Sequence, residues 1–136
     1  MVVVDASVIY KWLVDERPIQ TTQKARNILD KFLSNEEEVI CPDILLYELA
    51  NTFAFKTNLS TLDVRRIWGR FIVFKIPVMY PDFVFMTEAI KFSRKFKVSI
   101  YDAVYAVLAQ DKGCILITAD AKFADQVNLP FVKKLG

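Results

Sequence analysis

The chain has 136 residues, enough for one domain with a sizeable hydrophobic core, and we expect a single domain over residues 1–136. Apolar residues make up 54% of it, above the ~45–50% usual in soluble domains, so we expect a buried subunit or partner interface in addition to the core. The net charge of +2 excludes a generally polybasic nucleic-acid binder, and the absence of histidine excludes Ser-His-Asp triads, histidine general bases and the usual zinc sites.

Short apolar runs alternate with helical patterns from the first residues onward. Residues 2–4 form a buried strand, and a helix is expected to start near Ser7. A second helix over about 21–33 precedes a strand at 39–41. Pro42 and Asp43 are start signals for a helix that runs to about residue 56.

The second half of the chain continues the alternation. Ser60 and Asp63 have capping-box spacing for a helix to about residue 74, followed by a short strand at 76–79. Pro81 and Asp82 start a helix through residue 96, and Ser99 caps another over 100–112. A strand at 115–118, a loop or short helix, and an edge strand at 131–132 complete the predicted elements. Cys41 and Cys114 lack metal-ligand spacing and are interpreted as buried thiols.

This order of elements predicts an α/β fold, a three-layer α/β/α domain with a central, mostly parallel sheet. In such sheets, sites form beyond the carboxyl ends of the strands. Asp5 and Asp120 both follow strands, and placing the strand at 2–4 beside that at 115–118 brings them together. Glu48 and Asp102 lie near the starts of helices that can reach the same edge.

Four acidic residues among apolar neighbours indicate a cation site, because an ionised carboxylate next to a core needs a partner or a metal. Each residue also has a simpler interpretation. Asp5 and Asp120 are suited to capping a helix or a turn, and Asp102 completes a capping box with Ser99. Glu48 is the hardest to explain in this way, since it lies one helical turn from apolar Leu45. Asp43 is expected to be only an N-cap, and whether Asp125 joins the cluster is left open.

Four segments carry a family resemblance: Val3-Val4-Asp5-Ala6-Ser7, Pro42-Asp43-Ile44-Leu45-Leu46-Tyr47-Glu48-Leu49-Ala50-Asn51, Ser99-Ile100-Tyr101-Asp102-Ala103, and Thr118-Ala119-Asp120-Ala121-Lys122-Phe123. In this order and spacing they resemble the motifs of PIN-domain ribonucleases, and most of all those of the VapC-type toxins of toxin–antitoxin pairs.

The resemblance implies a PIN-like fold and an endoribonuclease that uses Mg²⁺, or Mn²⁺, to cleave RNA phosphodiester bonds. It also implies a VapB-type antitoxin partner, held in an apolar groove, and a homodimer or higher assembly. Matched by motif, the catalytic and metal-binding residues are Asp5, Glu48, Asp102 and Asp120. The supporting polar residues are Ser7, Asn51 and Thr118.

Two basic clusters are candidate RNA contacts, since cations near an acidic metal pocket attract phosphates without reading sequence. One comprises Arg65, Arg66 and Arg70, and the other Lys91, Arg94, Lys95 and Lys97. Charge on an outer helix face is more often simple solvation. The aromatic residues Phe53, Phe55, Trp68, Phe71, Phe74, Phe83 and Phe85 are expected in the core or an interface.

Three alternatives stay open. The first is a PIN nuclease that processes RNA without an antitoxin. The second is a receiver-like signalling module, which expects paired acids after the first strand, where Asp5 stands alone. The third is a haloacid-dehalogenase-like phosphatase, which expects an aspartate at the position of Ser7. We expect neither a membrane span nor a signal peptide, and therefore a cytoplasmic protein.

Overall fold

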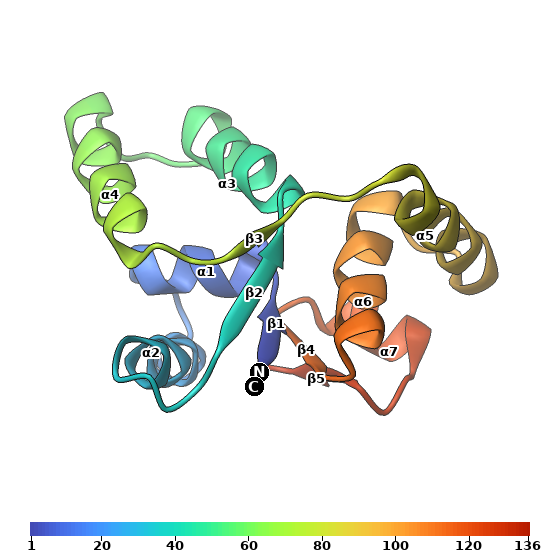
Figure 1. Cartoon of the computed structure of the whole chain (residues 1–136). Helices are drawn as coiled ribbons and strands as arrows, with labels where there is room; N and C mark the ends of the chain where they lie inside the picture. Colours follow the sequence, from blue (N-terminus) through green and yellow to red (C-terminus); the bar gives the residue numbers. More distant parts are fainter.

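The structure, a computed structural model, describes residues 1–136 as five strands and seven helices (Figure 1). The strands are β1 (Val2–Val4), β2 (Val39–Pro42), β3 (Val78–Met79), β4 (Ile115–Thr118) and β5 (Val132–Lys134). The helices are α1 (Ala6–Leu13), α2 (Ile19–Leu33), α3 (Ile44–Phe55), α4 (Thr61–Phe74), α5 (Phe83–Phe96), α6 (Ile100–Lys112) and α7 (Ala121–Val127).

The five strands form one parallel sheet in the order β3-β2-β1-β4-β5. In Figure 1, α1 to α4 lie to the left of the sheet and α5 to α7 to its right, which gives three layers. The predicted three-layer α/β/α fold is therefore confirmed. The expected neighbours are also confirmed, because β1 pairs with β4 in the register Val2 to Ile115 and Val4 to Ile117.

The hydrophobic core is centred on β1 and α6. Val3 and Val4 are fully buried, as expected for a central strand covered on both faces. In α6, every residue from Ala103 to Ala109 is buried, because this helix lies between the sheet and α5. A helix that is apolar on all sides is stable only in such a position.

The predicted capping residues explain where several helices begin. The Ser60 hydroxyl accepts from the Asp63 N–H at 3.1 Å, and the Asp82 carboxylate accepts from the Phe85 N–H at 2.7 Å. The expectation for Asp43 needs a correction. Asp43 occupies the N-cap position of α3, but its side chain makes no capping hydrogen bond, and its backbone is already helical. Its backbone N–H instead donates to the Met79 carbonyl of β3 at 2.9 Å.

The other differences from the sequence expectations concern element boundaries. The segment after β4 is a short helix, α7, and the last strand starts at Val132 rather than at residue 131. Cys41 is buried, as expected, whereas Cys114 is only partly buried. None of the helices has the length and apolar character needed to cross a membrane.

Candidate active site

Asp5 and Asp120 follow two neighbouring strands and each begins a helix. Asp5 is the N-cap of α1, and its carboxylate accepts from the Val8 N–H at 3.3 Å. Asp120 is the N-cap of α7 and accepts from the Phe123 N–H at 3.0 Å. Because β1 and β4 are parallel and paired, both caps lie at the same edge of the sheet. The capping interpretation is thus correct for both residues, and it is compatible with a site.

Two hydroxyl groups connect these strand ends. The Ser7 hydroxyl donates to the Asp5 carboxylate and accepts from the Ala119 N–H at 3.0 Å. The Thr118 hydroxyl is fully buried and accepts from the Asp120 N–H at 3.0 Å. Ser7 therefore ties the start of α1 to the end of β4, and Thr118 fixes the turn that leads to Asp120.

Asp102 and Glu48 approach the same edge from helices. Asp102 is half-buried in the first turn of α6, where its N–H donates to the Ser99 hydroxyl at 3.1 Å. Glu48 lies in the first half of α3, and its Oε1 atom is buried with no hydrogen-bond partner. The Tyr105 hydroxyl of α6 is the other buried side-chain polar atom without a partner. A carboxylate oxygen left unpaired in the interior is costly, and a bound cation would relieve that cost.

Burial and neighbouring negative charges make Asp5, Glu48 and Asp102 difficult to ionise. The pKa of Asp5 is raised to about 6, mainly by burial; hydrogen bonds with Ser7, Thr118 and Val8 oppose the shift, and the Asp102 charge adds a smaller contribution to it. Burial is also the main cause of the raised pKa of Glu48; the neighbouring Tyr105 hydroxyl opposes the shift, and Asp5 and Asp102 add to it. The pKa of Asp102 is raised by burial and then by Asp120. The four predicted acids thus form one electrostatically coupled cluster.

The cluster does not form a closed set of metal ligands in this structure. No three carboxylate or thiol side chains are placed so that they could hold one ion together. The donor chemistry nevertheless suits a hard divalent cation, which prefers oxygen ligands and is typically held by one or two carboxylates. The unpaired Glu48 oxygen and the raised pKa values of Asp5 and Asp102 are consistent with that fit.

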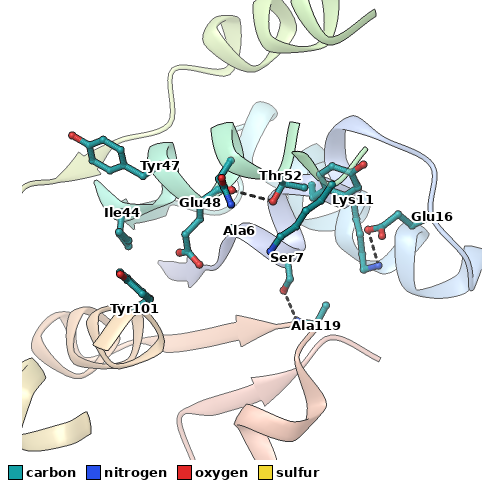
Figure 2. Close-up of a pocket in the computed structure, with 13 residues that line it drawn as sticks. Ala6, Ser7, Lys11, Glu16, Ile44, Tyr47, Glu48, Thr52, Tyr101 and Ala119 are labelled. Carbon is teal, nitrogen blue, oxygen red and sulfur yellow. Dashed lines mark hydrogen bonds and ion pairs between the residues drawn. The ribbon is translucent and has the colours of Figure 1, made fainter. Parts of the chain in front are cut away.

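A cavity of about 900 Å³ lies beside the acidic cluster (Figure 2). Its lining comes from α1, α3, the start of α6 and the turn after β4, and it includes Ser7, Glu48, Asn51 and Ala119. Asn51 lies on α3 one turn after Glu48 and is exposed. Two of the three predicted supporting residues, Ser7 and Asn51, therefore line the cavity, while the third, Thr118, is buried behind it.

The predicted basic clusters lie elsewhere. Arg65, Arg66 and Arg70 are exposed on α4, and Lys91, Arg94 and Lys95 are exposed on α5. None of them lines the cavity. Two have local partners: Lys91 pairs with Glu88 at 3.1 Å, and the Lys95 ammonium lies 5.3 Å from the centre of the Phe96 ring. Their contact with RNA stays a prediction.

Asp125, left open by the sequence, lies on α7 and pairs with Lys134 of β5 at 2.8 Å. It does not appear among the charges that shift the pKa values of Asp5, Glu48 or Asp102. The sequence interpretation missed other residues of the cavity wall, namely Tyr10, Lys11, Glu16, Tyr47, Lys56 and Tyr101. The spacing of Lys11 from Ser7 and of Lys56 from Glu48 indicates a shared helix face, but not that this face lines a cavity.

Comparison with known proteins identifies the family. Residues 2–128 match the PIN domain, so the chain belongs to the PIN domain family. No curated protein sequence matches it.

Solved structures share the fold over almost the whole chain. A toxin–antitoxin complex from Klebsiella pneumoniae is 13% identical, with a TM-score of 0.73, covering 100% of this chain and 98% of that one. VapBC2 from Rickettsia felis, bound to a DNA fragment from its promoter, is 14% identical, with a TM-score of 0.71 and 98% of both chains covered. VapC20 from Mycobacterium tuberculosis, a sarcin-ricin loop cleaving toxin, is 13% identical, with a TM-score of 0.67, covering 92% of this chain and 94% of that one.

Proposed function

We propose that this protein is a Mg²⁺- or Mn²⁺-dependent endoribonuclease and the toxin of a VapBC-type toxin–antitoxin pair. The observation that carries the proposal is the coupled cluster of Asp5, Glu48, Asp102 and Asp120 at the carboxyl edge of the sheet. Membership of the PIN domain family supports a nuclease, and the toxins among the structural neighbours support the toxin role. VapC20, a sarcin-ricin loop cleaving toxin, supports RNA as the substrate.

The chain's own residues account for most of the proposed chemistry. Asp5, Glu48, Asp102 and Asp120 are the groups that would hold a divalent ion. When bound, the ion supplies positive charge to the scissile phosphodiester and lowers the pKa of a water molecule. Ser7 holds the Asp5 carboxylate toward the strand edge through its hydrogen bond. Asn51 presents an amide to the cavity, where it can orient the RNA strand.

Two apolar surfaces fit the partners that the family suggests. A groove of about 390 Å³ between α3 and α4 is lined by Phe53, Ala54, Leu59, Val64 and Trp68, among others, and we propose it for the antitoxin. An amphipathic segment in such a groove would bind by ordinary helix-in-groove packing.

A second surface lies at the start of α5, where Phe83 is 94% exposed beside exposed Tyr80 and Val84. We propose this patch for a second copy of the chain. Sedimentation of the wild type and of Phe83→Ser tests whether the chain forms a dimer through this patch. The wild type should be dimeric and the variant monomeric. A monomeric wild type would rule the dimer out.

The enzymatic proposal is tested by incubating cellular RNA with antitoxin-free protein in Mg²⁺, Mn²⁺ or EDTA. Wild type should give discrete fragments only with a divalent ion, and Asp102→Asn should give none. Asp82→Asn is a matched control, because it makes the same change at an exposed helix cap outside the cavity. Cleavage by folded Asp102→Asn protein, or cleavage unaffected by EDTA, would contradict the proposal.

The toxin role is tested separately from the nuclease activity. A gene for a small antitoxin should lie next to the gene for this protein, and its product should suppress RNA cleavage when the two are expressed together. An active nuclease without such a neighbour would instead favour an RNA-processing role.

A further inference from the structure

The cavity extends well past the acidic cluster, and its two ends differ in chemistry. In Figure 2, Tyr47 and Tyr101 lie on one side of Glu48 and Ser7, while Lys11 and Glu16 lie on the other. Glu48, the one acid of the cluster that lines the cavity, therefore lies between its two ends. A strand that passes the acids would contact both ends.

Two helices lead from the acidic cluster to the basic end. On α1, Lys11 follows Ser7 by four residues, so it lies one turn further along the same helix face. On α3, Thr52 follows Glu48 by four residues, and Lys56, at the helix end, follows Thr52 by four more. The helices α1 and α3 pack against each other, and both lysines line the cavity. They are its only cationic side chains.

Lys11 is unusual because it is a lysine that is only 8% exposed. Lysine is seldom buried unless it is paired. Its ammonium donates to Glu16 Oε1 at 3.1 Å, which is the one hydrogen bond it makes within the chain. An ammonium carries three donors, so two remain for a ligand in the cavity. The backbone of Glu16 is fixed in turn, since its carbonyl accepts from the buried Thr22 hydroxyl at 2.8 Å. Lys11 is thus held at the cavity wall with two of its ammonium N–H donors unused within the chain.

The opposite end presents aromatic rings. Tyr47 directly precedes Glu48, and Tyr101 directly precedes Asp102, so each ring lies next to an acid of the site. Their side chains remain 70% and 54% exposed. Exposed aromatic rings along a strand path serve as stacking surfaces for unpaired bases, and this stacking tolerates any base.

We propose that the cavity binds single-stranded RNA on both sides of the scissile phosphodiester, with a flanking phosphate at Lys11 and Lys56 and a base against Tyr47 and Tyr101. This inference rests on the proposed nuclease function and adds the residues that bind the RNA strand on either side of the scissile phosphodiester. Stacking on the tyrosines needs an unpaired base, so a duplex serves as the comparison ligand in the test.

Binding measurements test the basic end. A fluorescein-labelled single-stranded oligoadenylate is titrated with full-length protein carrying Asp102→Asn, which prevents cleavage, at several salt concentrations. Each phosphate contact on a single strand contributes about 0.7 to the slope of log affinity against log salt. Lys11→Met and Lys56→Met should each weaken binding and lower that slope by about 0.7. Lys11→Arg should keep the slope. Lys112→Met, at an exposed position outside the cavity, should change neither quantity.

A purely structural role for Lys11 gives a different pattern. If the lysine only holds Glu16, then Glu16→Gln and Lys11→Met should reduce thermal stability alike, and neither should alter the salt slope. That result would overturn the assignment of the basic end. The proposal instead expects Glu16→Gln to bind RNA at least as tightly as its parent, because one negative charge leaves the cavity.

The aromatic end is tested by side-chain shape. Tyr101→Leu should weaken binding by between about 5-fold and 150-fold without changing the salt slope, whereas Tyr101→Phe should bind like its parent. Phe55→Leu is the control, since Phe55 is 84% exposed but lies outside the cavity. Equal affinity of the Leu and Phe variants at Tyr101, equal affinity for a duplex of the same length, or no binding at the lowest salt would overturn the inference. Because the wild type's cleavage of RNA is measured separately, these failures remain distinguishable from failure of the nuclease proposal.

Discussion

Replacing Asp5 by Asn is expected to stabilise the protein while abolishing cleavage. Asp5 is 8% exposed, and burial raises its pKa from 3.8 to about 6. The folded protein therefore holds the Asp5 proton more tightly than the unfolded chain does. The resulting stability is complete below pH 3.8 and is lost as the pH rises through about 6. An Asn side chain never ionises and so avoids this loss. It also keeps an oxygen that can accept from Val8 N–H and Ser7, so the α1 cap is preserved.

The magnitude follows from the shift in pKa. At roughly 1.4 kcal/mol per pKa unit, ionising Asp5 in the folded protein costs about 3 kcal/mol at pH 8. At pH 5 the cost is about half as large, roughly 1.5 kcal/mol, because Asp5 is then ionised in the unfolded chain but mostly protonated in the folded one. The variant's advantage in unfolding free energy should therefore grow by about 1.5 kcal/mol between these two pH values.

Urea unfolding in EDTA, followed by circular dichroism at pH 5 and pH 8, measures this difference. Asp82→Asn is again the control for the replacement itself, because Asp82 caps α5 with the same kind of hydrogen bond at an exposed position. A wild type that is more stable than Asp5→Asn at pH 8 would refute the reasoning. It would mean that the hydrogen bonds to the Asp5 carboxylate outweigh its burial.

Three further predictions concern the same edge of the sheet. Saturating Mg²⁺ should stabilise the wild type by about 2.7 kcal/mol at a hundred times its dissociation constant, and should do so less in Asp5→Asn, as read from thermal unfolding. Ser99→Ala should lower the free energy of unfolding by about 1 kcal/mol and also reduce cleavage, because the Ser99 cap holds the turn that carries Asp102. Ser60→Ala, at the cap of α4, is the control and should cost as much stability with cleavage unchanged. Ser7→Ala should destabilise by about 1–3 kcal/mol in urea unfolding, since it leaves the Ala119 N–H without its partner, and an unchanged midpoint would contradict that role.

Much of the fold could be predicted because its signals are local. The apolar run from Val2 to Val4 defines a central strand, and Ser60 and Ser99 mark helix starts through hydrogen bonds within one turn. The pairing of β1 with β4 could also be predicted, because Asp5 and Asp120 come directly after these two strands and the pairing brings them to the same edge of the sheet. Asp43 shows where local reasoning fails. Its position next to Pro42 indicated a cap, but the pairing of β2 with β3 draws its backbone to Met79 instead.

The cavity could not be predicted in the same way. Its wall combines side chains from α1, α3 and α6, and only the packing of these helices decides which of them face one another. The sequence therefore yielded the acids, which follow from strand ends and helix starts, but not Lys11. A lysine among apolar residues of a helix gives no sign of whether its ammonium reaches solvent or a cavity.

Because Asp5 and Asp120 lie at helix starts, the protein can lose the proposed activity without losing its fold. Asp5 and Asp120 each accept a backbone N–H through one carboxylate oxygen, and an asparagine side chain offers the same acceptor. Folding uses the oxygen, whereas ion binding uses the charge. A single Asp-to-Asn replacement at either position therefore separates the two, leaving a chain that folds and displays the same outer surfaces without the charge that the proposed reaction requires. Such a chain would still bind a partner that recognises those surfaces, and so would compete with the active protein for that partner.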